Sequence, residues 1–296
     1  MAIRRAHLVR GAEQRGILRR IRSWRIMDVP KDAYAFARRT LGSFVPTSPG
    51  SSLTARVLFS RVAELPFGDL DGLTGGRPAL VLAPHADDES LGCGGLIAEA
   101  CGRGTPPVVA ILTDGSMSHP GSRTHPPARL KALRQAEARA AMAALGMPED
   151  RLHFLDLPDG RAPREGPDME GSAARLAALA RANGVGAVFT TWEHDPHPDH
   201  VAAHVIGQTA ARLAGVRLVS YPVWGWTLPA GTRLPVATVS GLRLDVSRHL
   251  PAKARAIAAH ASQHGDVITD SPAGFRLPPS LLSAAAGRFE YFLFEG

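Results

Sequence analysis

The sequence predicts an α/β fold in which a mostly parallel sheet is flanked by helices, and two observations carry that prediction. Short apolar runs alternate along the chain with longer Ala-rich stretches of helical period. The 296 residues, of which 45% are hydrophobic and 21% charged, suffice for one large domain with a full core. Repeated strand and helix units of this kind place helices on both faces of parallel strands.

Five apolar runs are predicted strands, and the stretches between them are predicted helices. The strands fall at 79–85, 108–115, 152–158, 187–193 and 216–226. The helices fall at 91–104, 127–145, 172–184 and 199–215. Gly146 and Gly184 suit the left-handed position that ends a helix. The glycines of LGCGG, 91–95, would let the first helix pack close to a strand, with Cys93 as a small buried residue.

The C-terminal third continues the pattern less regularly. Residues 236–247, VATVSGLRLDVS, alternate like a strand pair or hairpin. Residues 251–263, PAKARAIAAHASQ, return to a helical period, with Pro251 placed near the start.

The basic charge of the chain is concentrated at its N-terminus. Residues 1–40 contain eleven Lys or Arg and three Asp or Glu, a balance of +8 against +7 for the whole chain. We therefore predict a basic extension and linker over 1–50 and one catalytic domain over 51–296, with the Pro/Gly/Ser cluster at 45–54 as the linker. Residues 15–27 have the spacing of an amphipathic helix. Such an arm is a solvated helix, a disordered tail, or a contact for an anionic surface or nucleic acid.

The cysteines and the hydropathy pattern indicate a cytoplasmic protein. Cys93 and Cys101 are the only cysteines, and their spacing fits neither a disulfide framework nor a thiolate zinc cluster. No stretch approaches the roughly 20 apolar residues of a membrane helix. The N-terminus lacks the apolar core of a secretory signal.

Two polar clusters follow predicted parallel strands, at the edge where α/β sheets bind ligands. HADDE occupies 85–89 and EHDPHPDH occupies 193–200. His85 and Asp88 are spaced to meet where a strand turns into a helix, and His200 from the other cluster completes a His2Asp set. Such a set holds a catalytic zinc with one position open for water, and iron, manganese or cobalt would also fit.

The neighbouring residues complete a hydrolytic site. Asp87 is left to act as general base on the water that such a metal activates. His197 is positioned to stabilise an oxyanion and to protonate a leaving amine. Glu89 is expected to support the ligands or to favour the helix N-terminus, and Asp199 is assigned a supporting position.

Simpler interpretations exist for several of these residues. A lone Asp-Asp pair at a helix start usually caps the helix, but a second cluster on the same edge argues against that here. Eight other histidines are expected to be structural or exposed: His119, His125, His153, His194, His204, His249, His260 and His264. A two-metal phosphoesterase would need more bridging carboxylates than the two loops supply.

The motifs PHADDESLGCGG, LTDG, RLKALRQAEARAAMAALG, LPDG and DPHPDHVAAH resemble, in this order, those of the PIG-L/LmbE-like zinc-dependent de-N-acetylases over roughly residues 78–265. The resemblance implies a Rossmann-like α/β fold and removal of an acyl group, usually acetyl, from an amino sugar. By position it implies the same ligands, base and acid as the chemistry above. It also implies that Arg134 and Asp159 hold sugar hydroxyls, although Arg134 could form a surface ion pair with Glu137 and Asp159 could serve a turn.

Two departures from the family pattern bear on the substrate. Ala86 stands where the family usually has proline, which leaves every ligand in place. Asp195 stands where mycothiol-pathway members have a mobile tyrosine, so the substrate of that branch is not carried over. Residues 116–127, SMSHPGSRTHPP, are expected to lie over the same edge and to shape acceptor specificity.

The sequence thus predicts a zinc-dependent N-deacetylase whose partner is a small amino sugar or glycoconjugate. An amidase for a non-sugar N-acyl compound is the alternative within enzymes. A nucleic-acid or anionic-surface binding protein that uses the basic arm is the alternative from another class.

Overall fold

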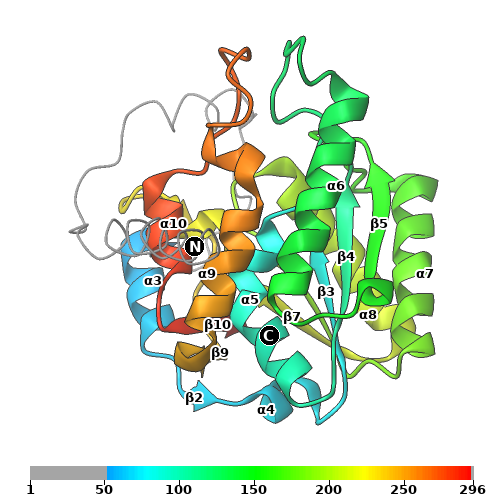
Figure 1. Cartoon of the computed structure of the whole chain (residues 1–296). Helices are drawn as coiled ribbons and strands as arrows, with labels where there is room; N and C mark the ends of the chain where they lie inside the picture. The colour runs from blue at the N-terminus through cyan, green and yellow to red at the C-terminus, as the bar shows by residue number, and fades with distance from the viewer. Residues whose placement is uncertain (1–51, 295–296) are drawn as a thin grey trace, which may run out of the picture.

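The computed structural model describes residues 52–294, in which eight strands form one mixed sheet (Figure 1). The order of strands across the sheet is β2-β9-β10-β7-β6-β3-β4-β5. Their bounds are β2 Phe67–Gly68, β3 Ala79–Ala83, β4 Val108–Thr113, β5 Leu152–Leu157, β6 Ala187–Thr191, β7 Arg217–Tyr221, β9 Gly241–Asp245 and β10 Phe289–Leu293. A separate short pair joins β1 (Leu53–Thr54) to β8 (Arg233–Leu234).

The prediction of a mostly parallel sheet is confirmed. Strands β7, β6, β3, β4 and β5 run parallel to one another, whereas β10 is antiparallel to both β7 and β9. The predicted strand pair over 236–247 is wrong, because only 241–245 forms a strand there. That strand pairs instead with β10 from the C-terminal end and with β2 from the start of the described chain.

Helices cover both faces of the sheet. Their bounds are α3 Ala55–Ala63, α4 Leu70–Thr74, α5 Asp88–Gly102, α6 Pro127–Ala144, α7 Gly166–Ala182, α8 Pro198–Ala214, α9 Leu250–Ala259 and α10 Pro279–Ala285. Gly146 and Gly184 both have the positive φ predicted for helix ends. The predicted strand at 216–226 ends at Tyr221, before a 3-10 turn at Trp224–Thr227. Two predicted helix boundaries are also wrong. Helix α7 starts six residues before Ser172, within a polar stretch that hides its start, and the predicted helix over 251–263 ends at Ala259, before a 3-10 turn at Ala261–His264.

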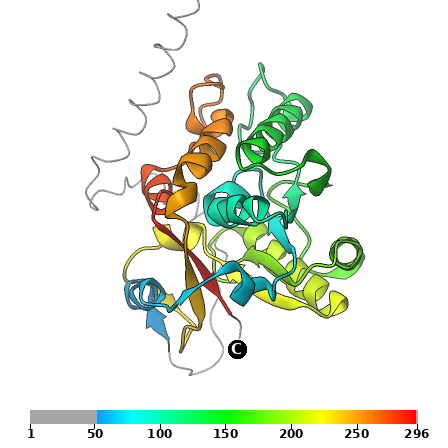
Figure 2. The same cartoon turned by 60° about the horizontal axis from the view of Figure 1, so that its bottom comes forward.

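Alternate residues of each central strand enter two different cores. Val81 and Ala83 of β3 pack with helices α5, α6, α9 and α10, whereas Leu80 and Leu82 pack with α7 and α8. In Figure 2, α6 (green) and α9 (orange) lie on one side of the sheet and α8 (yellow-green) lies on the other. Burial on both sides explains why the strand sequence is apolar throughout rather than alternating.

Helix α5 packs unusually close to its neighbours through its glycines, as the sequence predicted. A Cβ added to Gly92 would lie 2.3 Å from the ring of Tyr221, and one added to Gly95 would lie 2.4 Å from Val246. Cys93, between them, is fully buried. Because the glycines have no side chains, residues from β10 and α9 can reach the backbone of α5.

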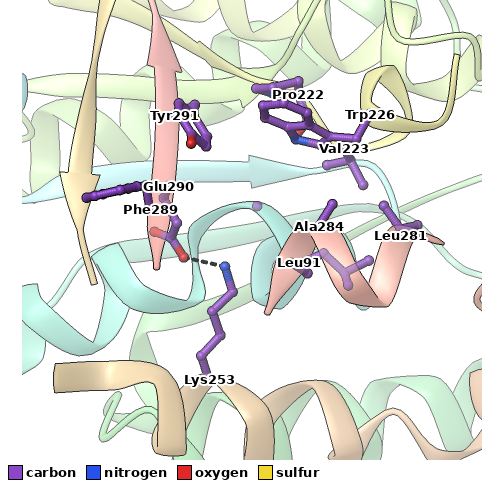
Figure 3. A pocket seen from close by; sticks show the side chains of 12 residues that line it. Leu91, Pro222, Val223, Trp226, Lys253, Leu281, Ala284, Phe289, Glu290 and Tyr291 are labelled. Carbon is purple, nitrogen blue, oxygen red and sulfur yellow. Dashed lines mark hydrogen bonds and ion pairs between the residues drawn. The ribbon is translucent and has the colours of Figure 1, made fainter. Parts of the chain in front are cut away.

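A buried ion pair occupies that contact (Figure 3). Lys253 Nζ lies 2.7 Å from Glu290 Oε1, and the same carboxylate accepts hydrogen bonds from the backbone N–H groups of Gly95 and Leu96. The pair lines a pocket together with Trp226 and other apolar side chains. None of the residues that line this pocket belongs to the polar clusters singled out in the sequence.

The carboxyl ends of β3, β4, β5, β6 and β7 lie along one edge of the sheet, and the loops that leave them carry both predicted polar clusters. Within residues 52–294, no helix is long and apolar enough to cross a membrane. The predicted basic extension and its amphipathic helix lie outside the described residues.

Candidate active site

The two polar clusters meet at the carboxyl edge of adjacent strands β3 and β6. Asp88 Oδ2 lies 3.1 Å from His85 Nδ1 and 3.2 Å from His200 Nε2. His85, Asp88 and His200 are 8%, 2% and 0% exposed. The structure therefore brings the three predicted ligands to a common point, with two imidazole nitrogens on one carboxylate oxygen.

The opposite ring nitrogens of both histidines are held by further carboxylates. His85 Nε2 lies 3.0 Å from Asp199 Oδ2, and Asp199 in turn accepts the backbone N–H groups of Gly160 and Ala162. His200 Nδ1 lies 3.0 Å from Asp195 Oδ2. Carboxylates in these positions fix the orientation and tautomer of metal-binding histidines.

The donor set fits a divalent metal ion. His200 Nε2 is buried and makes no hydrogen bond of acceptable geometry within the described part of the chain. A buried nitrogen in that state would be costly without a ligand. Two groups of side chains offer ligand atoms within 4.8 Å of one another: His85, His197 and His200, and His85, Asp159 and Asp199. Both share His85 with the predicted set, and the first also shares His200. Two imidazoles and a carboxylate are typical ligands of catalytic zinc, and other divalent transition metals accept them too.

The charges of the site are tightly linked. Burial opposes ionisation of Asp88, but the charges of His200 and His85 and the hydrogen bond from His85 outweigh it and lower the pKa of the carboxyl. Burial likewise lowers the pKa of His200, but Asp88 and Asp195 outweigh it and raise that pKa to about 9. The imidazole of His85 behaves in the same way, with Asp159, Asp199 and Asp88 holding its pKa well above the ordinary value.

Asp87 lies beside the ligands in a strained conformation. Its φ of 146° and ψ of −30° are rare for any residue except glycine. Its side chain makes no capping hydrogen bond to α5, so the simple capping interpretation is wrong. Burial raises the pKa of Asp87 to about 7, against the charge of Arg134, which lies 3.4 Å away. A carboxylate with that pKa is well matched to general-base chemistry near neutral pH.

His197 closes another side of the cluster. It is the N-cap of α8, and its Nδ1 accepts a hydrogen bond from the backbone N–H of Asp199 at 3.2 Å. The proton of the neutral ring therefore resides on Nε2. Its ring centroid lies 4.7 Å from that of His85 and 5.3 Å from that of His200. Burial lowers the pKa of His197 to about 3, and the charges of His85 and His200 add to the effect.

The two residues that the resemblance assigned to sugar binding both lie next to the cluster. Arg134 of α6 is 4% exposed and donates from Nη2 to the carbonyl of Ala86 at 2.7 Å. The alternative of a surface ion pair with Glu137 is wrong, since Glu137 is buried and accepts hydrogen bonds from Ser262.

Asp159 does occupy a turn, but its carboxylate faces the cluster. Its Oδ1 lies 3.4 Å from His85 Nε2, and its Oδ2 accepts the backbone N–H of Met117 at 2.8 Å. The second contact brings residues 116–127 to the edge of the site, as expected. Asp270 fixes the other end of this loop by accepting hydrogen bonds from the hydroxyl groups of Ser122 and Thr124 and from the backbone N–H groups of Arg123 and Thr124.

Sequence reasoning gave no role to two residues that the structure places next to the site. Asp195 was noted only as a departure from a family branch, yet it anchors His200. Its position five residues before His200 in the same motif was an available signal. His260 was assigned to the structural histidines, yet it contacts Glu89 from a segment 171 residues away. No spacing rule could have linked those two positions.

Comparison with known proteins finds a family match over part of the chain. Residues 80–211 match the PIG-L family model, described as GlcNAc-PI de-N-acetylase. A 1D-myo-inositol 2-acetamido-2-deoxy-alpha-D-glucopyranoside deacetylase from Actinosynnema mirum is 29% identical over 237 residues, which cover 64% of this chain and 82% of that protein.

Solved structures show the same fold. The deacetylase of the A40926 pseudoaglycone has 21% identity and a TM-score of 0.55, over 73% of this chain and 96% of that one. A 4-carboxy-2-hydroxymuconate hydratase from Pseudomonas putida KT2440 has 22% identity and a TM-score of 0.51, over 64% and 80%. The fold therefore hosts more than one reaction, and the residues of the site must decide between them. Residues 80–211 of this chain thus match a PIG-L family domain, and the A. mirum relative that shares this region is named as a deacetylase.

Proposed function

We propose that this protein is a metal-dependent hydrolase that removes an N-acetyl or other N-acyl group from an amino sugar or glycoconjugate. The observation that carries the proposal is the convergence of His85 Nδ1 and His200 Nε2 on one Asp88 oxygen, with Asp87 adjacent. The family description and the name of the A. mirum relative both support an amino-sugar deacetylase.

We assign His85, Asp88 and His200 as the metal ligands. A divalent metal held there would polarise the acyl carbonyl and lower the pKa of the attacking water. Zinc is our first choice, because two imidazoles and one carboxylate are a donor set that zinc accepts readily. Asp195 and Asp199 keep the two imidazoles in the orientation that this role requires.

The remaining steps belong to side chains of this protein. Asp87 takes a proton from the attacking water, and its pKa of about 7 lets the same carboxyl return that proton to the leaving amine. This step replaces the acid role expected of His197, because a pKa of about 3 leaves that imidazole neutral. His197, neutral and protonated on Nε2, donates a hydrogen bond to the oxygen that gains charge as the tetrahedral carbon forms. Arg134 and Asp159 flank the cluster and are assigned to the acceptor, with residues 116–127 as its outer wall.

The decisive experiment measures acetate release from a panel of N-acetylated sugars, from free N-acetylglucosamine to lipid-linked and nucleotide-linked forms. The Asp87→Asn variant should lose activity while it retains metal, as measured by atomic absorption. Asp71→Asn, which alters an exposed carboxylate paired with Arg103, serves as the matched control. Wild-type turnover in the Asp87→Asn variant would refute the assignment of the base.

The same assay separates the sugar reaction from an amidase for non-sugar compounds. Arg134→Ala should lower kcat/KM for any substrate, because Arg134 also holds the Ala86 carbonyl and contacts Asp87. Asp159→Ala should lower kcat/KM more for a sugar substrate, because a sugar-binding site depends on contacts to hydroxyl groups. Equal loss on a simple N-acyl amine would favour the amidase. We further propose that residues 51–296 form the catalytic unit, that residues 1–50 are a separate basic extension, and that the protein, with both cysteines free, works in the cytoplasm.

A further inference from the structure

A second buried cluster of polar side chains lies next to Asp87. It joins His260, from the C-terminal part of the chain, to Glu89 and Ser90. His260, immediately after α9, is 1% exposed. Its Nε2 lies 3.0 Å from Glu89 Oε1, and Ser90 Oγ donates to the same oxygen at 2.8 Å. Because a carboxylate oxygen only accepts, we assign the ring hydrogen to Nε2. One oxygen of Glu89 is thereby fixed by two donors.

The other oxygen of Glu89 holds the backbone of Asp87. Glu89 Oε2 accepts the Asp87 N–H at 2.9 Å, although the two residues are only two apart in the sequence. Arg134 restrains the preceding carbonyl of Ala86. A backbone conformation of this kind costs about 1–3 kcal/mol and persists only where its surroundings fix it. The Glu89 carboxylate is therefore one of the contacts that keep Asp87 at a φ of 146°.

The segment that carries His260 is itself rigidly attached. Ser262 donates from its N–H and from its Oγ to the two oxygens of Glu137, each at 2.7 Å. Gln263 Nε2 donates to Ser262 Oγ at 2.7 Å. These bonds join the end of α9 to α6, and Figure 1 shows the two helices side by side. His260 is thus held in place independently of its contact with Glu89.

We propose that His260 is a positioning residue that holds Asp87 in its reactive backbone conformation through Glu89. The inference rests on the function proposed above for Asp87. It differs from a merely structural role for a buried histidine, because it assigns the imidazole an effect on one step of the reaction. Among the described residues, His260 makes no hydrogen bond to the proposed metal ligands or to Asp87, so the hydrogen-bonded path from its imidazole to the Asp87 backbone runs through Glu89.

Two substitutions test the proposal by kinetics. His260→Leu removes the donor, whereas His260→Gln can place an amide N–H near the position of Nε2. We expect His260→Leu to lower kcat about 10- to 100-fold, the effect of losing a hydrogen bond to a charged group, with KM within about twofold of wild type. His260→Gln should recover most of that loss. His264→Leu, in the same turn but bonded to the carbonyl of Ile257, is the control and should retain wild-type kcat.

Crystal structures of the same variants test the proposal without any substrate. In His260→Leu the Asp87 φ should leave the region near 146°, or the distance from Glu89 Oε2 to the Asp87 N–H should exceed 3.5 Å, and both should stay native in His260→Gln. Native Asp87 geometry in His260→Leu would overturn the proposal, even if no acceptor had been found. Wild-type kcat in an active His260→Leu enzyme would also overturn it, while the loss of activity in Asp87→Asn would still support the deacetylase function. If His260→Leu does not fold, Glu89→Gln offers the same structural comparison, because its amide cannot accept from both sides.

Discussion

Asp195 is predicted to support metal binding through His200, so replacing it should weaken the affinity of the site for zinc. Its carboxylate is 1% exposed and accepts the backbone N–H groups of Val223 and Trp224, each at 3.0 Å, and of Gly225 at 2.7 Å. The oxygen shared by Val223 and Trp224 also lies 3.0 Å from His200 Nδ1. Asp195→Asn preserves the size of this side chain but removes its negative charge and changes its hydrogen bonding.

The magnitude follows from the number of donors that face the carboxylate. An asparagine side chain has one accepting oxygen, and its NH2 group can only donate. If the NH2 replaces Oδ1, the Gly225 N–H loses its acceptor; if it replaces Oδ2, three donors do. Each buried donor left without a partner costs about 1–3 kcal/mol. Loss of the anionic partner of a metal-binding histidine typically weakens metal binding about 10- to 100-fold.

Two measurements check this expectation. Competition titration with a zinc chelator should give the Asp195→Asn variant a Kd for Zn2+ about 10- to 100-fold above that of wild type. Chemical denaturation of the metal-free proteins should show a loss of at least about 1 kcal/mol. Asp245→Asn, which alters an exposed carboxylate paired with Arg288, is the control and should leave zinc affinity unchanged. Zinc affinity within twofold of wild type in Asp195→Asn would refute the assigned role of His200 or of its anchor.

Three further outcomes are expected. Gly92→Ala would place a Cβ 2.3 Å from the ring of Tyr221 and should cost about 1–3 kcal/mol in urea denaturation, whereas Gly102→Ala in the same helix meets no atom within 4 Å and should be neutral or stabilising. Lys253→Met leaves a buried carboxylate without its cation and should cost about 3–5 kcal/mol, so an unchanged Tm would contradict the ion pair. Because folding raises the pKa of Asp87 to about 7, native metal-free protein keeps a proton that the unfolded chain releases near pH 4, so this group's stability contribution falls as pH rises from about 4 to 7. Thermal melts across that range should show a smaller decline for Asp87→Asn, and equal declines would contradict the shift.

Local patterns predicted the central strands and the meeting of two clusters, because both depend on short-range features of the sequence. An apolar run followed by HADDE or HPDH marks the end of a buried strand and the residues just past it. Strand β10 escaped prediction because it pairs antiparallel to β7 and β9, which lie far away in the sequence. Its partners are fixed by tertiary packing and by no local period.

Supporting contacts were harder to predict than ligands for the same reason. Glu89 and Glu137 carry no signal of their partners, since His260 and Ser262 lie 171 and 125 residues further along the chain. Arg134 could be placed near Glu137 by helical spacing, but its actual contacts are with the loop after β3. A carboxylate that is expected to be buried must have hydrogen-bond donors near it, but only the fold shows which residues supply them.

The register of the sheet decides whether the two ligand groups can meet at all. β3 and β6 are adjacent parallel strands, with Leu80 opposite Val188 and Val81 opposite Phe189. A slip of one residue would move the loop after β6 by about 3.3 Å relative to His85, more than a metal site of fixed bond lengths tolerates. The same slip would turn every side chain of β6 to the opposite face and exchange the contents of two cores of different composition. Burial of apolar side chains therefore fixes the ligand geometry before any metal binds, and apolar strand sequences and polar motifs had to be interpreted together to predict the site.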